Sequence, residues 1–284
     1  MFFEDYVINI SSFREWLLDP SSVLTMGVLN VTPDSFSDGG KFNRLDLALK
    51  HFHSMLEDGA DIIDIGGEST KPGSDPVSIE EELNRIIPII NEIKKTSNDI
   101  LISVDTYKSV VAEEAIKAGA DIINDISGLA FDKDMASLLA KNDIPVIIMH
   151  IQGKPKTMQQ NISYNDLIYD IKQYFKKRCD YAIKSGIKKN NIILDPGIGF
   201  GKTFNHNYKL LKNLKIFKDM AYPLLIGPSR KAFIGDVLKL PPEERVEGTI
   251  ATVVAGILNG ANIVRVHDVK ENKRAIIVTE NIWP

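Results

Sequence analysis

Polar and charged side chains follow short apolar runs throughout this sequence. In chain order they are Asn30, Glu68, Asp105, Asn124, Asp125, His150, Asp195, Ser229, Arg230, Lys231, Arg265 and His267. A single residue of this kind would mean little, because solvated polar residues end strands in many folds. Polar endings on every run, with carboxylates and cations together, predict that the ends of the runs meet in one catalytic mouth.

Two kinds of chemistry are available in this set. Asn30, Asp38 and Asp34 supply hard oxygen ligands, which suit Mg²⁺ better than zinc. Magnesium usually keeps several waters and binds one or two protein oxygens together with substrate phosphates. Cations that could complete a diphosphate site are Lys71, Lys202, Lys231, Arg265 and His267. This combination would activate a phosphorylated leaving group.

Asp105, Asn124 and Asp195 suggest recognition of a ligand edge instead of metal binding. Their donors and acceptors could pair with the edge of a flat nitrogen heterocycle, since a carboxylate facing an amino-amidine edge is a natural partner. The alternative is that each side chain only satisfies neighbouring backbone groups.

The elements that must position these residues are eight apolar runs, each followed by a longer stretch with helical spacing. The runs are 23–30, 62–66, 101–105, 122–125, 146–150, 192–195, 224–227 and 263–267. Their near-continuous Ile, Val and Leu content predicts parallel strands buried on both faces. We therefore expect an α/β protein with a single (β/α)₈ barrel, and a doubly wound open sheet is the alternative.

A weak internal repeat supports the barrel. The segments 59–64, 119–124 and 260–265 each place a glycine before an apolar pair that leads to a polar residue. We expect Gly59, Gly119 and Gly260 to end helices at positive φ, followed by a tight turn into a strand.

Residues 1–20 lie outside the repeated pattern, and we expect them to cap the bottom of a barrel domain formed by residues 21–284. Two long segments, 32–43 and 68–78, would leave the catalytic face as lids or binding loops. The glycine-rich segment 196–203 resembles a phosphate loop but carries Pro196 where that motif needs glycine. We interpret it as a flexible site loop that carries Phe200.

Charge and cysteine content exclude several classes of protein. The net charge of −4 and the isoelectric point near 5.8 argue against a nucleic-acid partner held by a basic face. The single cysteine, Cys179, excludes an intrachain disulfide and favours a reducing cytoplasm. The N-terminal segment lacks the pattern of a signal peptide, and we expect no association with a membrane.

Seven motifs spread over nearly the whole chain form a recognisable pattern. They are LNVTPDSFSDGG at 29–40, GGESTKPG at 66–73, SVDTYK at 103–108, NDISG at 124–128, LDPGIGFGK at 194–202, GPSRKAFIG at 227–235 and RVHD at 265–268. Together they resemble the dihydropteroate synthases, a family of pterin-binding barrel enzymes in the folate pathway. The resemblance implies a transferase that joins p-aminobenzoate to 6-hydroxymethyl-7,8-dihydropterin diphosphate and releases diphosphate. It also implies assistance by Mg²⁺, competition by sulfonamides and assembly as a homodimer.

The resemblance also implies roles for individual residues. Asn30 and Asp38 would bind the metal. The residues implied to bind the pterin diphosphate are Thr70, Asp105, Asn124, Asp195, Lys231, Arg265 and His267, with Asp105, Lys231, Arg265 and His267 acting in catalysis. Those implied to border the p-aminobenzoate pocket are Phe36, Phe200, Ser229 and Lys231.

One position departs from the family pattern. Lys71 stands where the family commonly has arginine, so the charge is kept but the fork geometry is not. A pterin-dependent methyltransferase shares features such as Asp105, Asn124 and Asp195, but the 32–40 segment and the triplet 229–231 favour the synthase. A non-catalytic pterin-binding barrel is a further alternative, against which Asn30, Lys231, Arg265 and His267 weigh.

Overall fold

Eight parallel strands form the centre of the molecule. The computed structural model describes residues 8–32, 41–97 and 99–283. The strands are β1 (Leu24–Asn30), β2 (Ile62–Gly66), β3 (Leu101–Asp105), β4 (Ile122–Asp125), β5 (Val146–Met149), β6 (Ile192–Asp195), β7 (Leu225–Ile226) and β8 (Ile263–Val266). They pair in the order β6-β5-β4-β3-β2-β1-β8-β7, and a parallel bridge between Leu194 and Leu224 links β6 to β7. Because the two outermost strands meet, the sheet closes into the predicted barrel and is not a doubly wound open sheet.

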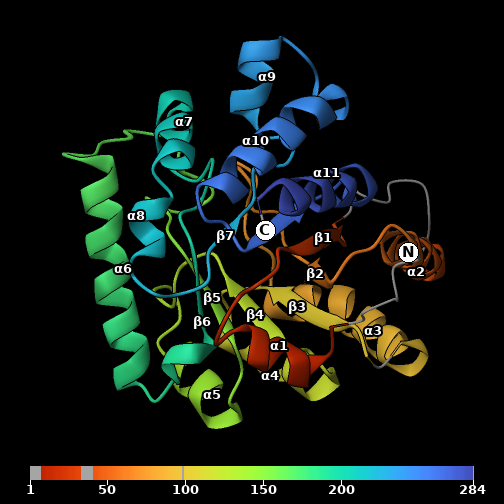
Figure 1. Cartoon of the computed structure of the whole chain (residues 1–284). Coiled ribbons are helices and arrows are strands. Elements are labelled where there is room, and N and C mark those ends of the chain that lie inside the picture. The colour runs from red at the N-terminus through yellow and green to blue at the C-terminus, as the bar shows by residue number, and fades with distance from the viewer. Residues whose placement is uncertain (1–7, 33–40, 98, 284) are drawn as a thin grey trace.

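Helices cover the outside of the barrel (Figure 1). They are α1 (Ile10–Trp16), α2 (Lys41–Glu57), α3 (Ile79–Thr96), α4 (Ser109–Ala118), α5 (Met135–Asn142), α6 (Leu167–Lys184), α7 (Phe204–Lys212), α8 (Lys215–Lys218), α9 (Ala232–Leu238), α10 (Val246–Leu258) and α11 (Val269–Ile282), with short 3₁₀ turns at Lys189–Asn191 and Pro242–Glu244. In the described part of the chain, no helix combines the length and the apolar character needed to cross a membrane.

The predicted strands agree with the structure except at their ends. Four of them, β2, β3, β4 and β6, have the predicted bounds, whereas β1 begins one residue later and β5 and β8 each end one residue earlier. The largest difference is at β7, which keeps only Leu225–Ile226 of the predicted 224–227. Pro223 and Pro228 flank this run, and neither has a backbone N–H to extend the ladder.

The three repeat glycines end helices as predicted. Gly59, Gly119 and Gly260 have φ angles of 91°, 111° and 102°, in the left-handed region that side chains with a Cβ rarely adopt. Each glycine precedes a strand that begins three residues later, at Ile62, Ile122 and Ile263. Each repeat segment therefore corresponds to the end of a helix, a tight turn and the start of the next strand.

The bottom of the barrel is apolar and covered by α1. Asn9 caps this helix by accepting hydrogen bonds from the backbone N–H groups of Ser11 and Ser12. Phe13 and Trp16 stack with ring centroids 5.6 Å apart and belong to one buried cluster with residues from near the start of every strand. The strand members of this floor cluster are Leu24, Met26, Ile62, Leu101, Ile122, Ile147, Ile193, Leu225 and Ile263. Helix α1 thus packs on this end of the barrel, while the division into a capping segment at 1–20 and a barrel domain at 21–284 stays a prediction.

The same interior face of the strands carries the apolar floor at one end and polar residues at the other. Side chains two residues apart on a strand point to the same face. Ile62 and Leu101 in the floor therefore share the barrel interior with Asp64 and Asp105 higher in the same strands. Intervening residues such as Ile63 and Ile102 belong to the outer apolar cluster that also contains buried helix residues. The interior consequently changes from apolar to polar along the barrel axis.

Candidate active site

The carboxyl ends of the strands bring four predicted site residues into one polar mouth. In the strand register Asp105 pairs with Gly66 on one side and with Asn124 on the other. Asp195 ends β6 and Arg265 lies in β8, and the interior alternation directs all four inward. Asp105, Asn124 and Asp195 are buried, so their polar groups meet inside the barrel and away from bulk water.

Arg265, on β8, forms ion pairs with carboxylates of β2 and β3, which lie on the other side of β1. Its Nε donates to Asp64 Oδ2 over 2.6 Å, and its Nη2 donates to Asp105 Oδ2 over 3.0 Å. Asn124 Nδ2 also donates to Asp64 Oδ2, at 3.1 Å. Asp64 is fully buried and orients both Arg265 and Asn124.

Sequence reasoning missed Asp64 because it considered only residues at the ends of the runs. The internal repeat holds the missing signal. Asp64, Asn124 and Arg265 occupy the same position in the three repeat segments 59–64, 119–124 and 260–265. Equivalent positions in equivalent units face the same space, and the structure places these three side chains in contact.

Several oxygens in the mouth are free to accept further hydrogen bonds. Asp64 Oδ1, Asp105 Oδ1 and Asn124 Oδ1 are buried and have no hydrogen-bond partner among the described residues. A buried acceptor without a partner is costly, and sites of this kind are commonly completed by a ligand. Burial raises the pKa of Asp105 to about 7, against the opposing effect of the Arg265 charge. The mouth can therefore receive a ligand that presents several N–H donors.

Asp195 and Lys231 form the other side of the mouth. Asp195 Oδ1 accepts a 2.7 Å hydrogen bond from the N–H of Gly197, and burial raises the pKa of Asp195 to about 6. Burial, together with the charge of Arg265, lowers the pKa of Lys231 to about 8, whereas Asp195 and Asp105 act in the opposite direction. Lys231 thus carries its charge at neutral pH in a desolvated setting.

Phe200 and Lys231, both predicted for one pocket, are neighbours. Lys231 Nζ lies 4.1 Å from the centroid of the Phe200 ring, within the range of a cation–π contact. Gly199 permits this approach: it has a φ of 84°, and a Cβ there would lie 2.9 Å from Lys231 Cδ. The loop after β6 is therefore shaped to lie close to the lysine.

Ser229 and His267 are also brought together. The backbone N–H of His267 donates to Ser229 Oγ over 3.1 Å, and His267 Nδ1 lies 3.0 Å from the same oxygen. Burial and the nearby Arg265 charge lower the pKa of His267 to about 3. The imidazole is neutral at pH 7, so it offers hydrogen bonds and not the positive charge expected from the sequence.

Three polar residues near the mouth, two at strand ends and Lys202 in the loop after β6, make their contacts within the protein. Lys202 is buried, with Nζ 3.0 Å from His150 Nδ1 and donating to the Phe200 carbonyl at 2.9 Å. Burial lowers the pKa of Lys202 to about 7. Asp125 accepts hydrogen bonds from the N–H groups of Ser127 and Leu129. Lys202, His150 and Asp125 thus shape the loops around the mouth.

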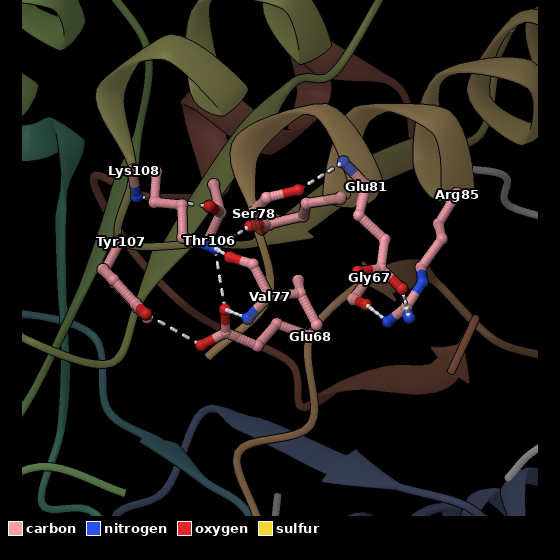
Figure 2. A network of polar contacts seen from close by, with 10 residues as sticks. Gly67, Glu68, Val77, Ser78, Glu81, Arg85, Thr106, Tyr107 and Lys108 are labelled. Atoms are coloured by element: carbon pink, nitrogen blue, oxygen red, sulfur yellow. Dashed lines mark hydrogen bonds and ion pairs between the residues drawn. The ribbon is translucent and has the colours of Figure 1, made fainter. Parts of the chain in front are cut away.

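The second loop joins β2 to α3 and carries Thr70, which is half-buried, and Lys71, which is exposed. Its base is held by a network that includes Glu68, Tyr107 and Lys108 (Figure 2). Lys71 therefore lies on the outer part of this loop and not among the inward-facing residues of the mouth.

Asn30 ends β1 at the rim of the mouth and is half-buried. Its Oδ1 lies 3.5 Å from the position of a Cβ built on Gly66, so the absence of a side chain at Gly66 leaves room beside this oxygen. Within residues 8–32, 41–97 and 99–283, no group of three or more His, Cys, Asp and Glu side chains could hold a metal. A single amide oxygen suits Mg²⁺ that takes its other ligands from water and phosphate. Asp34, Phe36 and Asp38 lie outside the described residues.

The fold and the mouth together define a class. Inward-facing carboxylates, an amide and two cations at the carboxyl ends of (β/α)₈ strands are typical of a barrel enzyme that binds a polar, flat substrate. A family model described as "Pterin binding enzyme" matches residues 26–267.

Similar proteins narrow this class. The chain is 53% identical to a dihydropteroate synthase of Clostridium beijerinckii, with 90% of this chain and 93% of that protein covered. It is also 53% identical to the Bacillus subtilis dihydropteroate synthase, over 88% of this chain and 85% of that protein. A Yersinia pestis dihydropteroate synthase solved with a sulfonamide drug complex has a TM-score of 0.88 at 47% identity, covering 93% and 96% of the two chains. The chain belongs to the pterin-binding enzyme family and, within it, to the dihydropteroate synthases.

Proposed function

We propose that this chain joins p-aminobenzoate to 6-hydroxymethyl-7,8-dihydropterin diphosphate and releases 7,8-dihydropteroate and diphosphate. The observation that carries the proposal is the set of buried acceptors around Arg265: Asp105 Oδ1 and Asn124 Oδ1 are without partners among the described residues. A pterin presents ring and amino N–H donors along one edge, which is the complement of these oxygens. The two dihydropteroate synthases that are 53% identical to this chain support this choice.

Asp105, Asn124 and Asp195 would hold the pterin ring, and Thr70 would contact the substrate from the second loop. Arg265 is fixed by Asp64 and Asp105, so its planar guanidinium is oriented before a ligand arrives. Lys231 lies near both Asp195 and Asp105, where its ammonium adds a donor to the same ligand. The ring would be held on several sides, which places its exocyclic carbon in a defined position.

Arg265 and His267 would receive the diphosphate, and Asn30 with Asp38 would hold Mg²⁺ beside it. Mg²⁺ would neutralise charge that develops on the departing diphosphate. Arg265 adds a guanidinium that suits phosphate oxygens, whereas neutral His267 contributes a hydrogen bond. These residues stabilise the leaving group without a protein nucleophile.

The chemical step exchanges one bond at the exocyclic methylene carbon. The carbon–oxygen bond breaks and its electron pair leaves with diphosphate, while the electron-rich dihydropterin supports positive charge at the carbon. Nearby carboxylates such as Asp105 favour that charge. The amine nitrogen of p-aminobenzoate then forms the new bond and loses a proton. Phe200, Ser229 and Lys231, together with Phe36, would border the pocket that positions the amine.

Purified protein supplied with the pterin diphosphate, p-aminobenzoate and Mg²⁺ tests this function. We expect equal amounts of diphosphate and dihydropteroate, and no arylamine adduct when p-aminobenzoate is replaced by benzoate, which lacks the attacking amine. In the complete mixture, diphosphate release without dihydropteroate would mean that the protein only hydrolyses the substrate, and absence of both products would exclude the synthase function.

We also propose that the protein works as a cytoplasmic homodimer. Support for the dimer comes from apolar side chains exposed on α10 and α11 and beyond α11, namely Leu258, Val278, Ile282 and Trp283. The free, buried Cys179 is compatible with a reducing compartment. Light scattering should give twice the mass of the chain, and Val278→Asp should shift the protein toward the monomer.

A further inference from the structure

The second loop leaves the barrel after β2 and returns to begin α3, and its two ends lie against each other. The N–H of Val77, near the end of the loop, donates to Glu68 Oε2, near its start, over 2.9 Å. Residues 69–76 therefore form an excursion that closes on a short stem made of Glu68 and Val77.

One ammonium group holds both sides of this stem. Lys108 Nζ donates to Glu68 Oε2 at 2.7 Å and to the Val77 carbonyl at 2.7 Å (Figure 2). It also donates to Glu82 Oε2 at 2.6 Å. An ammonium has three N–H donors, and all three are used. Tyr107 Oη donates to the other oxygen of Glu68 over 2.8 Å. We call Glu68, Val77, Glu82, Tyr107 and Lys108 the clasp.

The clasp is buried, so its contacts are strong compared with surface ion pairs. The side chains of Glu68, Glu82 and Lys108 are 6%, 1% and 14% exposed. Burial disfavours the charge on Lys108, but hydrogen bonds with Glu68 and Glu82 outweigh it and raise the pKa. Two buried carboxylates depend on one cation, and removing that cation would leave both uncompensated.

The clasp is joined to the pterin side of the mouth by a short piece of backbone. Lys108 follows Asp105 by three residues. Its N–H donates to Thr106 Oγ1 over 3.2 Å, and the N–H of Thr106 donates to the Asn124 carbonyl over 3.1 Å. The stem of the second loop is thereby held at a fixed place relative to Asp105 and Asn124.

The outer part of the loop is held more weakly. Gly73 N–H donates to the Pro155 carbonyl over 3.1 Å, and Lys156 pairs with Asp75 at 2.5 Å. Both partners of this ion pair are more than half exposed, and exposed pairs contribute little to stability. The loop therefore combines a firm stem with an outer part that can rearrange at small cost.

We propose that Lys108 is a positioning residue that holds Thr70, through the stem of the second loop, in place to contact the pterin diphosphate. The proposal rests on the proposed function, because Thr70 matters only if a pterin substrate binds. Lys108 itself contacts no substrate, because its three donors are used within the clasp. By holding the stem, Lys108 keeps the second loop at the mouth while the outer part of the loop adjusts around the ligand.

Hydrogen exchange and steady-state kinetics on Lys108→Met and Lys108→Arg test this role. In Lys108→Met we expect faster amide exchange across 69–77 and a KM for the pterin diphosphate raised about tenfold, because a misplaced contact loses binding energy. The KM for p-aminobenzoate should change less than about threefold. Lys108→Arg keeps the charge and should restore much of the pterin KM, although its fork cannot reproduce all three contacts.

Lys94→Met is the matched control. Lys94 is similarly buried and donates to Asp121 Oδ2 at 2.8 Å and to the Ile100 carbonyl at 3.0 Å, near the amino ends of β3 and β4. We expect it to lower stability without changing exchange at 69–77 or either KM. Equal changes in both variants would overturn the proposal, because general destabilisation would then explain them.

A milder variant covers the case in which Lys108→Met does not fold. Glu68→Gln keeps the size of the side chain but replaces one acceptor oxygen by a donor, so it should also speed exchange across 69–77. Wild-type exchange at 69–77 in a folded Glu68→Gln protein would contradict the clasp. Exchange is measured without substrate, so a protein with a working clasp and no synthase activity would refute only the proposed function.

Discussion

The floor and the mouth of the barrel share the same strands but have opposite physical character. In the floor, Phe13 and Trp16 of α1 pack on Ile62, Leu101 and other apolar residues that are all nearly inaccessible to solvent. In the mouth, two residues further along β2, Asp64 is buried just as deeply, and one of its oxygens has no partner among the described residues.

The difference separates stability from function within one interior. Burying the apolar floor stabilises the fold, whereas burying the carboxylates of the mouth costs free energy unless a ligand supplies hydrogen bonds. We therefore expect substitutions in the floor to change unfolding and substitutions in the mouth to change catalysis.

Phe13→Ala should have the largest effect on stability. The ring is fully buried against Trp16, so its removal should lower the free energy of unfolding by about 3–5 kcal/mol. Urea unfolding measures this loss. Activity at a temperature where the variant is folded should stay close to wild type. Leu18→Ala, at a mostly exposed position, is the control and should change stability by less than about 0.5 kcal/mol.

Lys231→Ala should have the largest effect on turnover. Removing a preorganised donor from a desolvated site should lower kcat/KM by about 10²- to 10³-fold. Urea unfolding should show little loss of stability, because burial already disfavours the ammonium and lowers its pKa. Lys209→Ala removes an exposed lysine of α7 and should leave both quantities unchanged. A large loss of stability in Lys231→Ala would break the separation between mouth and floor.

The plot of kcat/KM against pH should be bell-shaped and narrow. Lys231 has a pKa lowered to about 8, so its ammonium is lost as the pH rises through that value. Asp105 and Asp195 have pKa values raised to about 7 and about 6, so their carboxylates become protonated as the pH falls. On the alkaline limb kcat/KM should fall about tenfold per pH unit, and on the acid limb the fall should steepen from about tenfold to about a hundredfold per pH unit once both carboxylates are protonated. Lys231→Arg should move the alkaline limb upward, and an unmoved limb would assign it to another group.

Lys71→Arg should have the smallest effect. Lys71 is exposed on the outer part of the second loop, and an arginine there could form a bidentate contact with phosphate. We expect the KM for the pterin diphosphate to fall by about two- to threefold, because a forked contact adds a hydrogen bond. An increase in this KM would show that the loop is adapted to lysine.

Much of the fold followed from local sequence rules. Near-continuous apolar runs predicted parallel strands, and the glycines at 59, 119 and 260 predicted helix ends followed directly by the next strand. The positive φ of these glycines and the closed barrel agree with both predictions. Strand ends predicted that Asp105, Asn124 and Arg265 would meet, because parallel strands present their carboxyl ends on one side.

The parts that could not be predicted depend on contacts between distant segments. Lys202 was a candidate for binding diphosphate, but the loop after β6 folds back so that its ammonium lies against His150. Asp64 was missed because it lies within an apolar run and not at its end. The internal repeat aligns it with Arg265, but their contact forms only when β2 and β8 are brought near each other. The three hydrogen bonds that Lys108 donates likewise form only when the segment after β3, the second loop and α3 are brought together.

The separation of mouth and floor is tested most directly by the pH dependence of unfolding in wild type and Asp105→Asn. Burial raises the pKa of Asp105 from 3.8 to about 7 in the folded protein, so the folded state resists its ionisation. Asp105 should therefore reduce stability progressively as the pH rises from about 4 to about 7.

Asn cannot ionise, so the variant should gain stability relative to wild type across this pH range while its synthase turnover falls by about 10²-fold. That combination would show a residue kept for function at the expense of stability. Parallel stability curves for the two proteins, or an ordinary rate in Asp105→Asn, would contradict the account.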